Sequence, residues 1–182
     1  MITLNEKMRM RPLEEEDKKV FWELAFKDAN PEWKKWDAPY YTHEALSYES
    51  FLDKWPHYEK QEDLFGMFVG EKLIGTVSFY WEHQPSNWLE AGIIIYDSTL
   101  WNEGYGTPFL KAWITHLFDT LPLVRVGFTT WSGNKRMMRL GEKLGMTLEA
   151  RLRKCRLYQD TYYDSIRYGV LREEWLGFSH DR

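Results

Sequence analysis

A chain of 182 residues with one cysteine suits a single domain, residues 1–182, that buries its own core and has no internal disulfide. Its charges are interspersed and sum to −4, which does not match the basic face of a nucleic-acid-binding protein and does not favour a membrane surface. No apolar stretch is long enough for a signal peptide or a membrane span, so we expect a cytoplasmic protein.

The first part of the chain predicts one strand followed by two helices. Apolar and basic residues alternate over residues 8–11 and end at Pro12, which is typical of a short strand. Residues 14–27 carry apolar side chains at helical spacing and acidic residues in the first turn. A loop rich in Pro, Trp and Tyr follows over residues 30–42, and a second helix is expected over residues 43–58, with Thr42 as its N-cap.

The rest of the chain alternates between strand and helix patterns. Strands are expected over residues 64–69, 73–81, 88–96 and 123–131, and two more between 146 and 171 with a turn near 159–161. Apolar residues at helical spacing predict a helix from Phe109 to Phe118, and a shorter one over 134–144 that ends at Gly145. This order predicts an α/β fold, a mixed sheet of about seven strands with helices on its faces.

The most informative segment lies between a predicted strand and a predicted helix and reads Trp101-Asn102-Glu103-Gly104-Tyr105-Gly106-Thr107. Its glycines let the backbone turn tightly and approach a ligand closely, and the first amides of a helix have no internal partner. Together with the helix dipole they suit a pyrophosphate. A plain strand-to-helix turn is the alternative. A P-loop string is absent, and the third glycine of a Rossmann fingerprint is replaced by Phe109.

This segment and its surroundings resemble the GNAT superfamily of N-acetyltransferases, most of all the branch with ribosomal-protein and spermidine N-acetyltransferases. The similarity covers roughly residues 8–175. The similar pieces occur in the same order and at similar spacing; they are residues 90–95, Trp101 with residues 104–107, residues 130–134, 142–146, 148–153, 162–164 and 171–175.

The resemblance implies a GNAT fold, acetyl-CoA as co-substrate, and a sheet whose central strands splay apart to admit the pantetheine arm. The residues that it assigns to the cofactor are Ile93, Ile94, Ile95 and Tyr96 on the strand edge, Trp101, Asn102, Glu103, Gly104, Tyr105, Gly106 and Thr107 at the phosphates, and Asn134 at the pantetheine. Asn134 is also placed to cap a helix, and the two roles are compatible.

The expected reaction is attack of an amine on a thioester, which requires that the ammonium first lose a proton. Glu90, three residues before the cofactor edge, is the predicted general base, acting directly or through water; a carboxylate that only faces solvent is the alternative. Glu149 and Asp164 are weaker candidates and are expected in ion pairs with nearby Arg151, Arg153 or Arg167. The residues expected to line the acceptor pocket are Trp33, Trp36, Tyr40 and Tyr41, with ordinary packing as their alternative.

Pro108 and Phe109 stand where the branch usually has Glu-Ala, and two further departures from the family pattern bear on the general acid. Gly141 and Met137 stand where many relatives carry a Tyr and a Ser, so the usual side chain that protonates the thiol is missing. An acyl-CoA-binding module without turnover therefore stays open beside the enzyme. The acceptor is expected to be a small-molecule or peptide amine. No metal-ligand spacing occurs, and a homodimer is left open.

Overall fold

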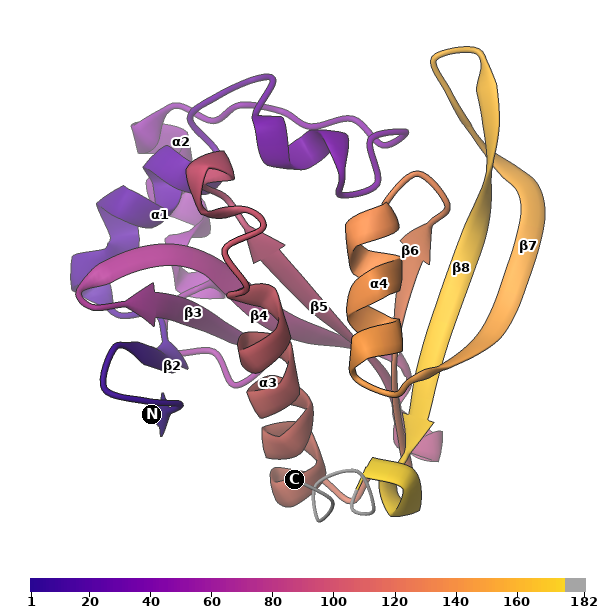
Figure 1. Cartoon of the computed structure of the whole chain (residues 1–182). Helices are drawn as coiled ribbons and strands as arrows, with labels where there is room; N and C mark the ends of the chain where they lie inside the picture. Colours follow the sequence, from indigo (N-terminus) through magenta and orange to yellow (C-terminus); the bar gives the residue numbers. More distant parts are fainter. Residues whose placement is uncertain (176–182) are drawn as a thin grey trace. The chain divides into compact units, whose positions relative to one another are not determined.

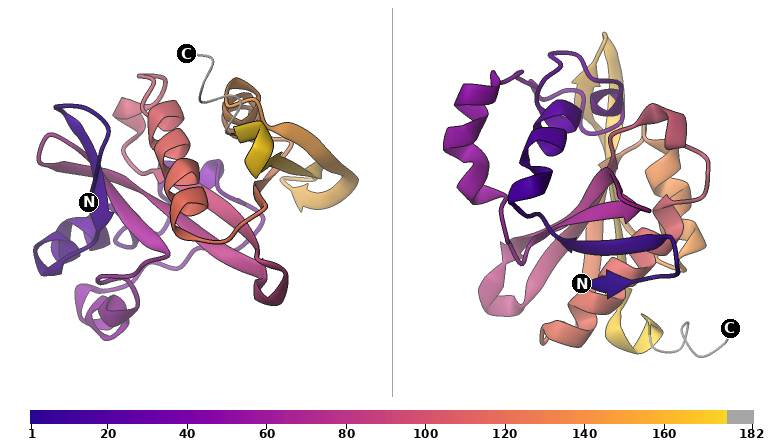
Figure 2. Two further views of the ribbon diagram at one scale, coloured as in Figure 1. Left: turned by 90° about the horizontal axis from the view of Figure 1, so that it is seen from below. Right: turned by 90° about the vertical axis from the view of Figure 1, so that its left-hand side faces the viewer.

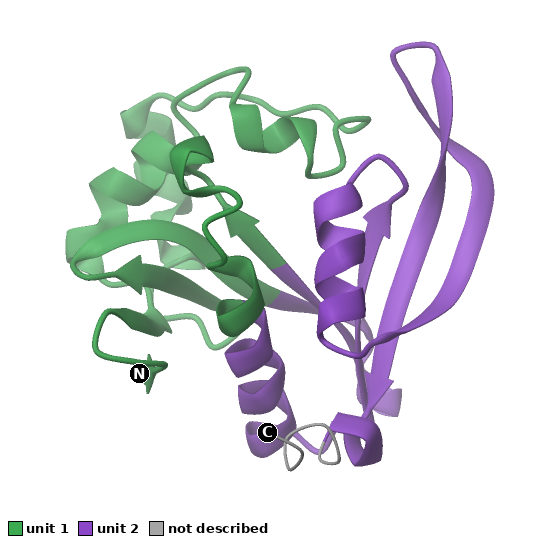
Figure 3. Ribbon diagram, in the orientation of Figure 1, with its two compact units in different colours: residues 1–78, 93–109 green, residues 79–92, 110–182 purple. Residues whose placement is uncertain are grey.

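The computed structural model describes residues 1–175 and divides into two compact units (Figure 3). The first unit holds residues 1–78 and 93–109, and the second holds residues 79–92 and 110 onward. The chain passes from one unit to the other within the strands β4 and β5 and within the helix α3. The single domain over residues 1–182 stays a prediction, and residues 176–182 lie outside the described part.

The first unit is built on an antiparallel sheet in the order β1-β2-β3-β4-β5 (Figure 1). Every strand except β1 was predicted, and β1 is too short to show a period. Gly70, at a φ of 59°, turns β3 into β4 at the predicted position. The strands are β1 (Ile2–Thr3), β2 (Met8–Pro12), β3 (Leu64–Val69), the first part of β4 (Lys72–His83) and the end of β5 (Trp88–Ile95).

The helices of the first unit are shorter than predicted. Residues 14–27 form a 3-10 turn, η1 (Glu15–Asp17), followed by α1 (Lys18–Ala25). The second helix, α2 (Tyr48–Lys54), starts later than expected, so the prediction of Thr42 as its N-cap is wrong. Ser47 is the cap, since its hydroxyl accepts a hydrogen bond from the backbone amide of Ser50 at 3.1 Å. Apolar residues before Ser47 pack on the core without being helical, and their spacing made the predicted helix too long.

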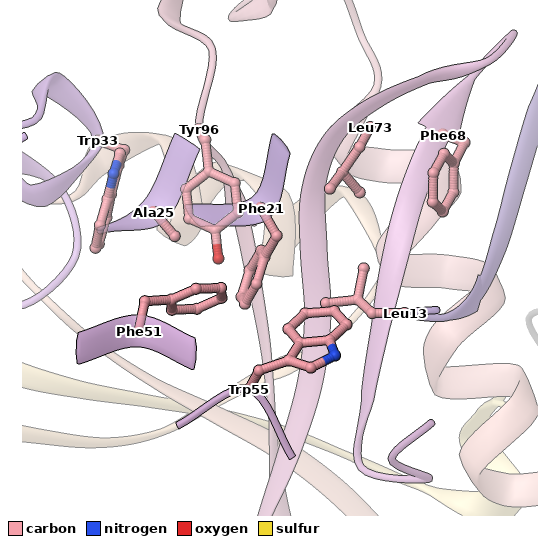
Figure 4. Close-up of a cluster of buried hydrophobic side chains, with 9 residues drawn as sticks. All are labelled: Leu13, Phe21, Ala25, Trp33, Phe51, Trp55, Phe68, Leu73 and Tyr96. Carbon is pink, nitrogen blue, oxygen red and sulfur yellow. The ribbon is translucent and has the colours of Figure 1, made fainter. Parts of the chain in front are cut away.

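An aromatic core holds the first unit together (Figure 4). Phe21 of α1 lies edge-on to Phe51 of α2 and to Tyr96, with ring centroids 6.1 and 6.2 Å apart. Such pairs add about 0.5–1.5 kcal/mol beyond the area that they bury. The core therefore fixes Tyr96, the residue that follows β5, against α1 and α2. Its nine buried members are Leu13, Phe21, Ala25, Trp33, Phe51, Trp55, Phe68, Leu73 and Tyr96.

The second unit contains a sheet in the order β4-β5-β6-β8-β7, with β5 and β6 parallel. The β7–β8 hairpin turns through Gln159 and Asp160, both at positive φ, at the predicted turn, and its tip extends past β6 (Figures 1 and 2). Its remaining strands are β6 (Arg125–Trp131), β7 (Thr147–Tyr158) and β8 (Thr161–Leu171).

The parallel pairing of β5 with β6 is short. It joins Leu89 to Val126 and Glu90 to Gly127. Within the described residues of the second unit it does not continue to Ala91 and Gly92, although β6 stays paired with β8 as far as Trp131. The expected separation of the two strands therefore begins directly after Glu90.

Two helices were predicted after β5 and both are present. α3 (Gly106–Thr120) buries the predicted apolar face, with Leu110 and Trp113 fully buried. α4 (Lys135–Lys143) lies over one face of β6 and β8, where Gly141 approaches the ring of Phe128 (Figure 1). Gly145, at a φ of 69°, follows its end as predicted.

Candidate active site

The predicted site residues fall into two groups, one in each unit. The first unit contains the end of the cofactor strand, the glycine segment and the aromatic loop. The second contains Glu90 and Asn134.

The end of β5 is held by contacts with β4. The amide of Tyr96 donates to the carbonyl of Ile74 at 3.0 Å, and the Tyr96 hydroxyl is 3.0 Å from Oγ1 of Thr76. Burial raises the pKa of Tyr96 far above its ordinary value, so the phenol stays neutral. Ile93, Ile94 and Ile95 are half-buried. The Tyr96 side chain is thus part of the core, and any contact that it makes with a cofactor would come from its backbone.

The glycine segment forms an open turn ahead of α3. Asn102 and Gly104 adopt positive φ angles of 66° and 88°. Among the described residues, the amides of residues 102–105 donate to no backbone carbonyl. A Cβ built on Gly104 would meet nothing within 4 Å, so no side chain fills the space beside this backbone. The turn therefore presents unpaired amides next to a helix N-terminus, which is the arrangement that binds anions.

Two side chains attach this segment to the rest of the first unit. Trp101 donates its indole N–H to the carbonyl of Ile95 at 2.9 Å. Asp97 accepts from the amide and the hydroxyl of Thr99 and forms an ion pair with Lys72 at 2.7 Å. Hydrogen bonds from Lys72 and Thr99 lower the pKa of Asp97 to about 2. Trp101 therefore positions the loop rather than lying free for a ligand, and Asp97 fixes the turn before it.

We expect Asp97→Asn to lower the free energy of unfolding at pH 7. The folded pKa of about 2 lies below the ordinary value of about 3.9, so the stabilisation is present above pH 4 and is lost as the pH falls toward 2. The difference between wild type and variant should therefore shrink over that interval in urea unfolding at a series of pH values. A difference that stays constant from pH 7 to pH 2 would contradict the assignment.

The aromatic loop contacts both the strand end and the glycine segment that are predicted to bind the cofactor. Trp36 lies edge-on to Trp101 at 6.3 Å, and Trp33 lies edge-on to Tyr96 at 5.4 Å. Trp33 is buried, and its indole N–H has no hydrogen-bond partner in the part of the chain that the structure describes. Tyr40 and Tyr41 pack on one another, and Tyr41 is exposed. The structure thus brings two of the four predicted acceptor residues, Trp33 and Trp36, beside predicted cofactor residues, and Trp33 is part of the aromatic core.

Sequence reasoning missed one carboxylate in this loop. Asp37 keeps contact with solvent, yet the atoms crowded around its carboxyl raise its pKa above the ordinary value, while Lys34 opposes the shift. Lys34 donates instead to the backbone carbonyls of Asp37 and Ala38. Ala38 follows at a φ of 43°, an unusual conformation for a residue with a Cβ. The sign of this carboxylate in the sequence is its place between the aromatic residues Trp36 and Tyr40.

Glu90 is fully buried in a charged network of the second unit. Its Oε1 accepts from Arg125 and from the indole of Trp88, each at 3.1 Å, and lies 3.8 Å from Arg167. Within residues 1–175, its Oε2 accepts only a long bond, 3.4 Å, from Thr129. Glu90 therefore does not simply face solvent, and one of its oxygens is saturated while the other is nearly free.

Glycines make room for this network. Gly127 and Gly169 pair across β6 and β8, and a Cβ at either position would overlap the Arg125 guanidinium or the Glu149 carboxyl. Arg125 also pairs with Glu149, so this predicted alternative base is bound in an ion pair. Asp164 likewise pairs with Arg151 at 2.6 Å. The predicted pairing of Asp164 is confirmed, whereas Glu149 pairs with Arg125 of β6 and not with one of the predicted arginines.

Asn134 caps α4, since its side chain accepts from the amide of Met137 at 3.0 Å. The predicted capping role is therefore confirmed, and the contact with pantetheine stays a prediction. Gly141 has no room for a tyrosine, because even a Cβ there would lie 2.8 Å from the Phe128 ring. The close packing of α4 on β6 therefore leaves no space for the tyrosine that serves as the usual general acid.

Neither a metal cluster nor a membrane-spanning helix occurs among the described residues. Across residues 1–175, no three His, Cys, Asp or Glu side chains gather as a metal site would require. No helix within the same span is both long and apolar enough to cross a bilayer.

Comparison with known proteins places this arrangement in a family. Residues 7–147 match the family described as Acetyltransferase (GNAT) domain. The chain belongs to this family.

Individual relatives of this GNAT chain are distant. Two Bacillus subtilis proteins are similar over part of their length: the SPbeta prophage-derived uncharacterized N-acetyltransferase YokL, 34% identical over 40% of this chain, and the uncharacterized N-acetyltransferase YoaA, 28% identical over 56%. The matched stretches span only 41% and 57% of those proteins.

Solved structures share the fold more completely. The spermidine N-acetyltransferase from Vibrio cholerae in complex with CoA and spermine has a TM-score of 0.77 at 18% identity, covering 94% of this chain and 99% of that one. An acetyltransferase (GNAT family) from Bacillus anthracis has a TM-score of 0.73 at 22% identity, covering 93% and 97%. At these identities the similarity establishes the fold alone.

Proposed function

We propose that the chain transfers an acetyl group from acetyl-CoA to a primary amine by direct attack on the thioester. The observation that carries this proposal is the open turn at residues 102–105, whose unpaired amides precede the N-terminus of α3. The pyrophosphate of CoA would accept hydrogen bonds from these amides. The adjoining strand end at residues 93–96 would pair with the pantetheine arm.

We expect Gly104→Val to weaken binding of CoA by about 100-fold or more, as loss of one or two charge-assisted hydrogen bonds at about 1.5–3 kcal/mol each would do. The φ of 88° strains any residue with a Cβ, and a valine side chain would occupy the space that is open for phosphate. Calorimetric titration with CoA measures the change.

Gly70→Val is the matched control for this substitution. Gly70 also has a positive φ, 59°, and open space beside it, but it lies in the turn between β3 and β4. The Gly70→Val variant should lose about as much stability as Gly104→Val and keep its affinity for CoA. Unchanged affinity in a folded Gly104→Val variant would refute the placement of the phosphates.

The acceptor that the loop favours is a cationic amine. Aromatic faces and a carboxylate together suit an ammonium group, and Trp36, Tyr40, Tyr41 and Asp37 supply both in one short segment. The V. cholerae relative was solved with spermine, which is a polyamine. A thiol-release assay with polyamines, peptides with free N-termini and neutral small amines ranks the acceptors. Preference for neutral amines would contradict this assignment.

The alternative function is a GNAT-fold module that binds acyl-CoA without turnover. The packing of Gly141, which leaves no room for the usual acid, favours it. CoA thiolate is a fair leaving group, so protonation by water is sufficient in the enzymatic proposal. Binding of acetyl-CoA without thiol release in any amine would favour the module. Whether the chain forms a homodimer and works in the cytoplasm stays a prediction.

A further inference from the structure

A buried base needs a route by which its proton reaches water. Glu90 has no exposed surface, and it is enclosed by side chains from four other strands. The groups that face it or its partners are Trp88 on its own strand, Arg125 and Thr129 on β6, Arg167 on β8, Tyr80 and Glu82 on β4, and Glu149 on β7 beyond Arg125.

The cationic side of this enclosure cannot carry the proton. The guanidinium groups of Arg125 and Arg167 only donate hydrogen bonds, and Glu149 and Glu90 raise the pKa of Arg125 although burial opposes the shift. Trp88 donates from an indole nitrogen that does not titrate. Trp88 and Arg125 donate hydrogen bonds to Oε1, and Arg167 lies closest to the same oxygen. Oε1 is therefore occupied by donors and cations.

The Oε2 side has hydroxyl groups instead. Thr129 Oγ1 donates to Oε2 at 3.4 Å. Burial raises the pKa of the Tyr80 phenol and the Thr129 hydroxyl opposes that rise, so the two hydroxyls are neighbours. Tyr80 is 52% exposed, so its hydroxyl lies between the buried pair and solvent. Hydroxyl groups both donate and accept, which is the property that a proton relay requires.

Thr129 also lies where the sheet opens. It is two residues beyond Gly127, the last residue of β6 that pairs with β5, and so it shares a face with Gly127 and with the partner of that residue, Glu90. Among the described residues of the second unit, β6 has no paired residue on β5 at that position. The hydroxyl is therefore at the boundary between the buried network and the separation of the strands.

We propose that Thr129 and Tyr80 form a relay that carries the proton from Glu90 Oε2 to solvent. This proposal rests on the proposed function and on the predicted role of Glu90 as the general base, which takes a proton from the acceptor ammonium through a water. In that step an N–H bond breaks and an O–H bond forms on Oε2. The freed amine forms the C–N bond, the C–S bond breaks to release CoA thiolate, and the second proton that the nitrogen loses passes through water to that thiolate.

The base is then reset through the hydroxyls. Glu90 passes its proton to Thr129 Oγ1 while the Thr129 proton moves to the Tyr80 oxygen and the Tyr80 proton leaves to water. Every group ends with the number of protons that it had at the start. Thr129 and Tyr80 thus act through Glu90 as relay residues and do not touch the reacting carbon.

The test measures thiol release by the full chain with acetyl-CoA and the best amine of the acceptor panel. Tyr80→Phe and Thr129→Val should each lower kcat by about 10-fold, part of the 10²–10⁴-fold that general-base catalysis supplies, with KM nearly unchanged. Both should recover turnover when millimolar imidazole is added as an external proton acceptor. Thr129→Ser, which restores the hydroxyl, should be close to wild type without imidazole. A purely structural role would not produce this rescue.

Tyr162→Phe is the matched control, because Tyr162 is 60% exposed on the β7–β8 hairpin and has no place in the relay. It should show wild-type turnover and no response to imidazole. If Tyr80→Phe and Thr129→Val are folded and as active as wild type while Glu90→Gln is impaired, the relay is overturned and the proposed function stands. If wild type releases no thiol with any amine, both are overturned.

Discussion

The Gly75→Ala variant is expected to lose about 3 kcal/mol or more of its free energy of unfolding and to lose affinity for CoA with it. A Cβ on Gly75 would overlap the backbone carbonyl oxygen of Ile94 and lie 2.6 Å from Cε of Met67. Overpacking usually costs about 1–3 kcal/mol when side chains can move aside. Here the obstacle is backbone in the strand end predicted to bind pantetheine, so relief requires that this strand end shift.

Gly66→Ala on the adjacent strand β3 is the matched control for that substitution. Its added Cβ would approach side chains alone, with Leu13 at 2.8 Å and Leu73 at 2.9 Å. It should therefore cost less stability and leave CoA binding intact. Urea unfolding and calorimetry on both variants make the comparison. Equal losses of stability in the two variants, with CoA affinity retained in Gly75→Ala, would show that the Ile94 carbonyl is not a constraint on the cofactor strand.

Glu90→Gln is expected to lower kcat by about 10²–10⁴-fold, the usual contribution of a general base, and to change KM little. Glutamine keeps the shape and can still accept from Trp88, but it cannot take a proton. Arg125 retains Glu149 as a partner, so the substitution does not leave this cation unpaired. Steady-state kinetics over pH 6–9 measures both constants.

Glu149→Gln separates the chemistry of Glu90 from the stability of its network. It removes the other carboxylate on Arg125 and leaves Glu90 in place. We expect a loss of stability comparable to that of Glu90→Gln with turnover within a few-fold of wild type. If the two variants lose the same turnover, or if Glu90→Gln equals wild type across the pH range, Glu90 is not the base.

Much of the fold could be predicted because its signals are local. Apolar spacing predicted α3, Asn134 and Gly145 predicted both ends of α4, and β-branched residues predicted β5. The start of α2 was not predictable in the same way. Thr42 and Ser47 are equally good caps by residue type, and the choice between them depends on how Phe51 and Trp55 pack in the aromatic core.

The site was predictable to a lesser extent because its contacts are long-range. The glycine segment could be read from its own residues, and its open, unpaired turn matches that reading. The pairing of Glu90 with Arg125 links residues 35 positions apart, and depends on glycines at 127 and 169 whose only sign in sequence is a missing side chain. Nothing in a sequence alone shows that Thr129 and Tyr80 lie on the open side of that carboxylate.

The most direct measurement of the central claim is calorimetric titration of the full chain with CoA. The proposal predicts saturable binding at one site per chain, weakened at least about 100-fold by Gly104→Val and unchanged by Gly70→Val. Absence of any heat of binding at millimolar CoA, or equal affinity in wild type and a folded Gly104→Val variant, would contradict it.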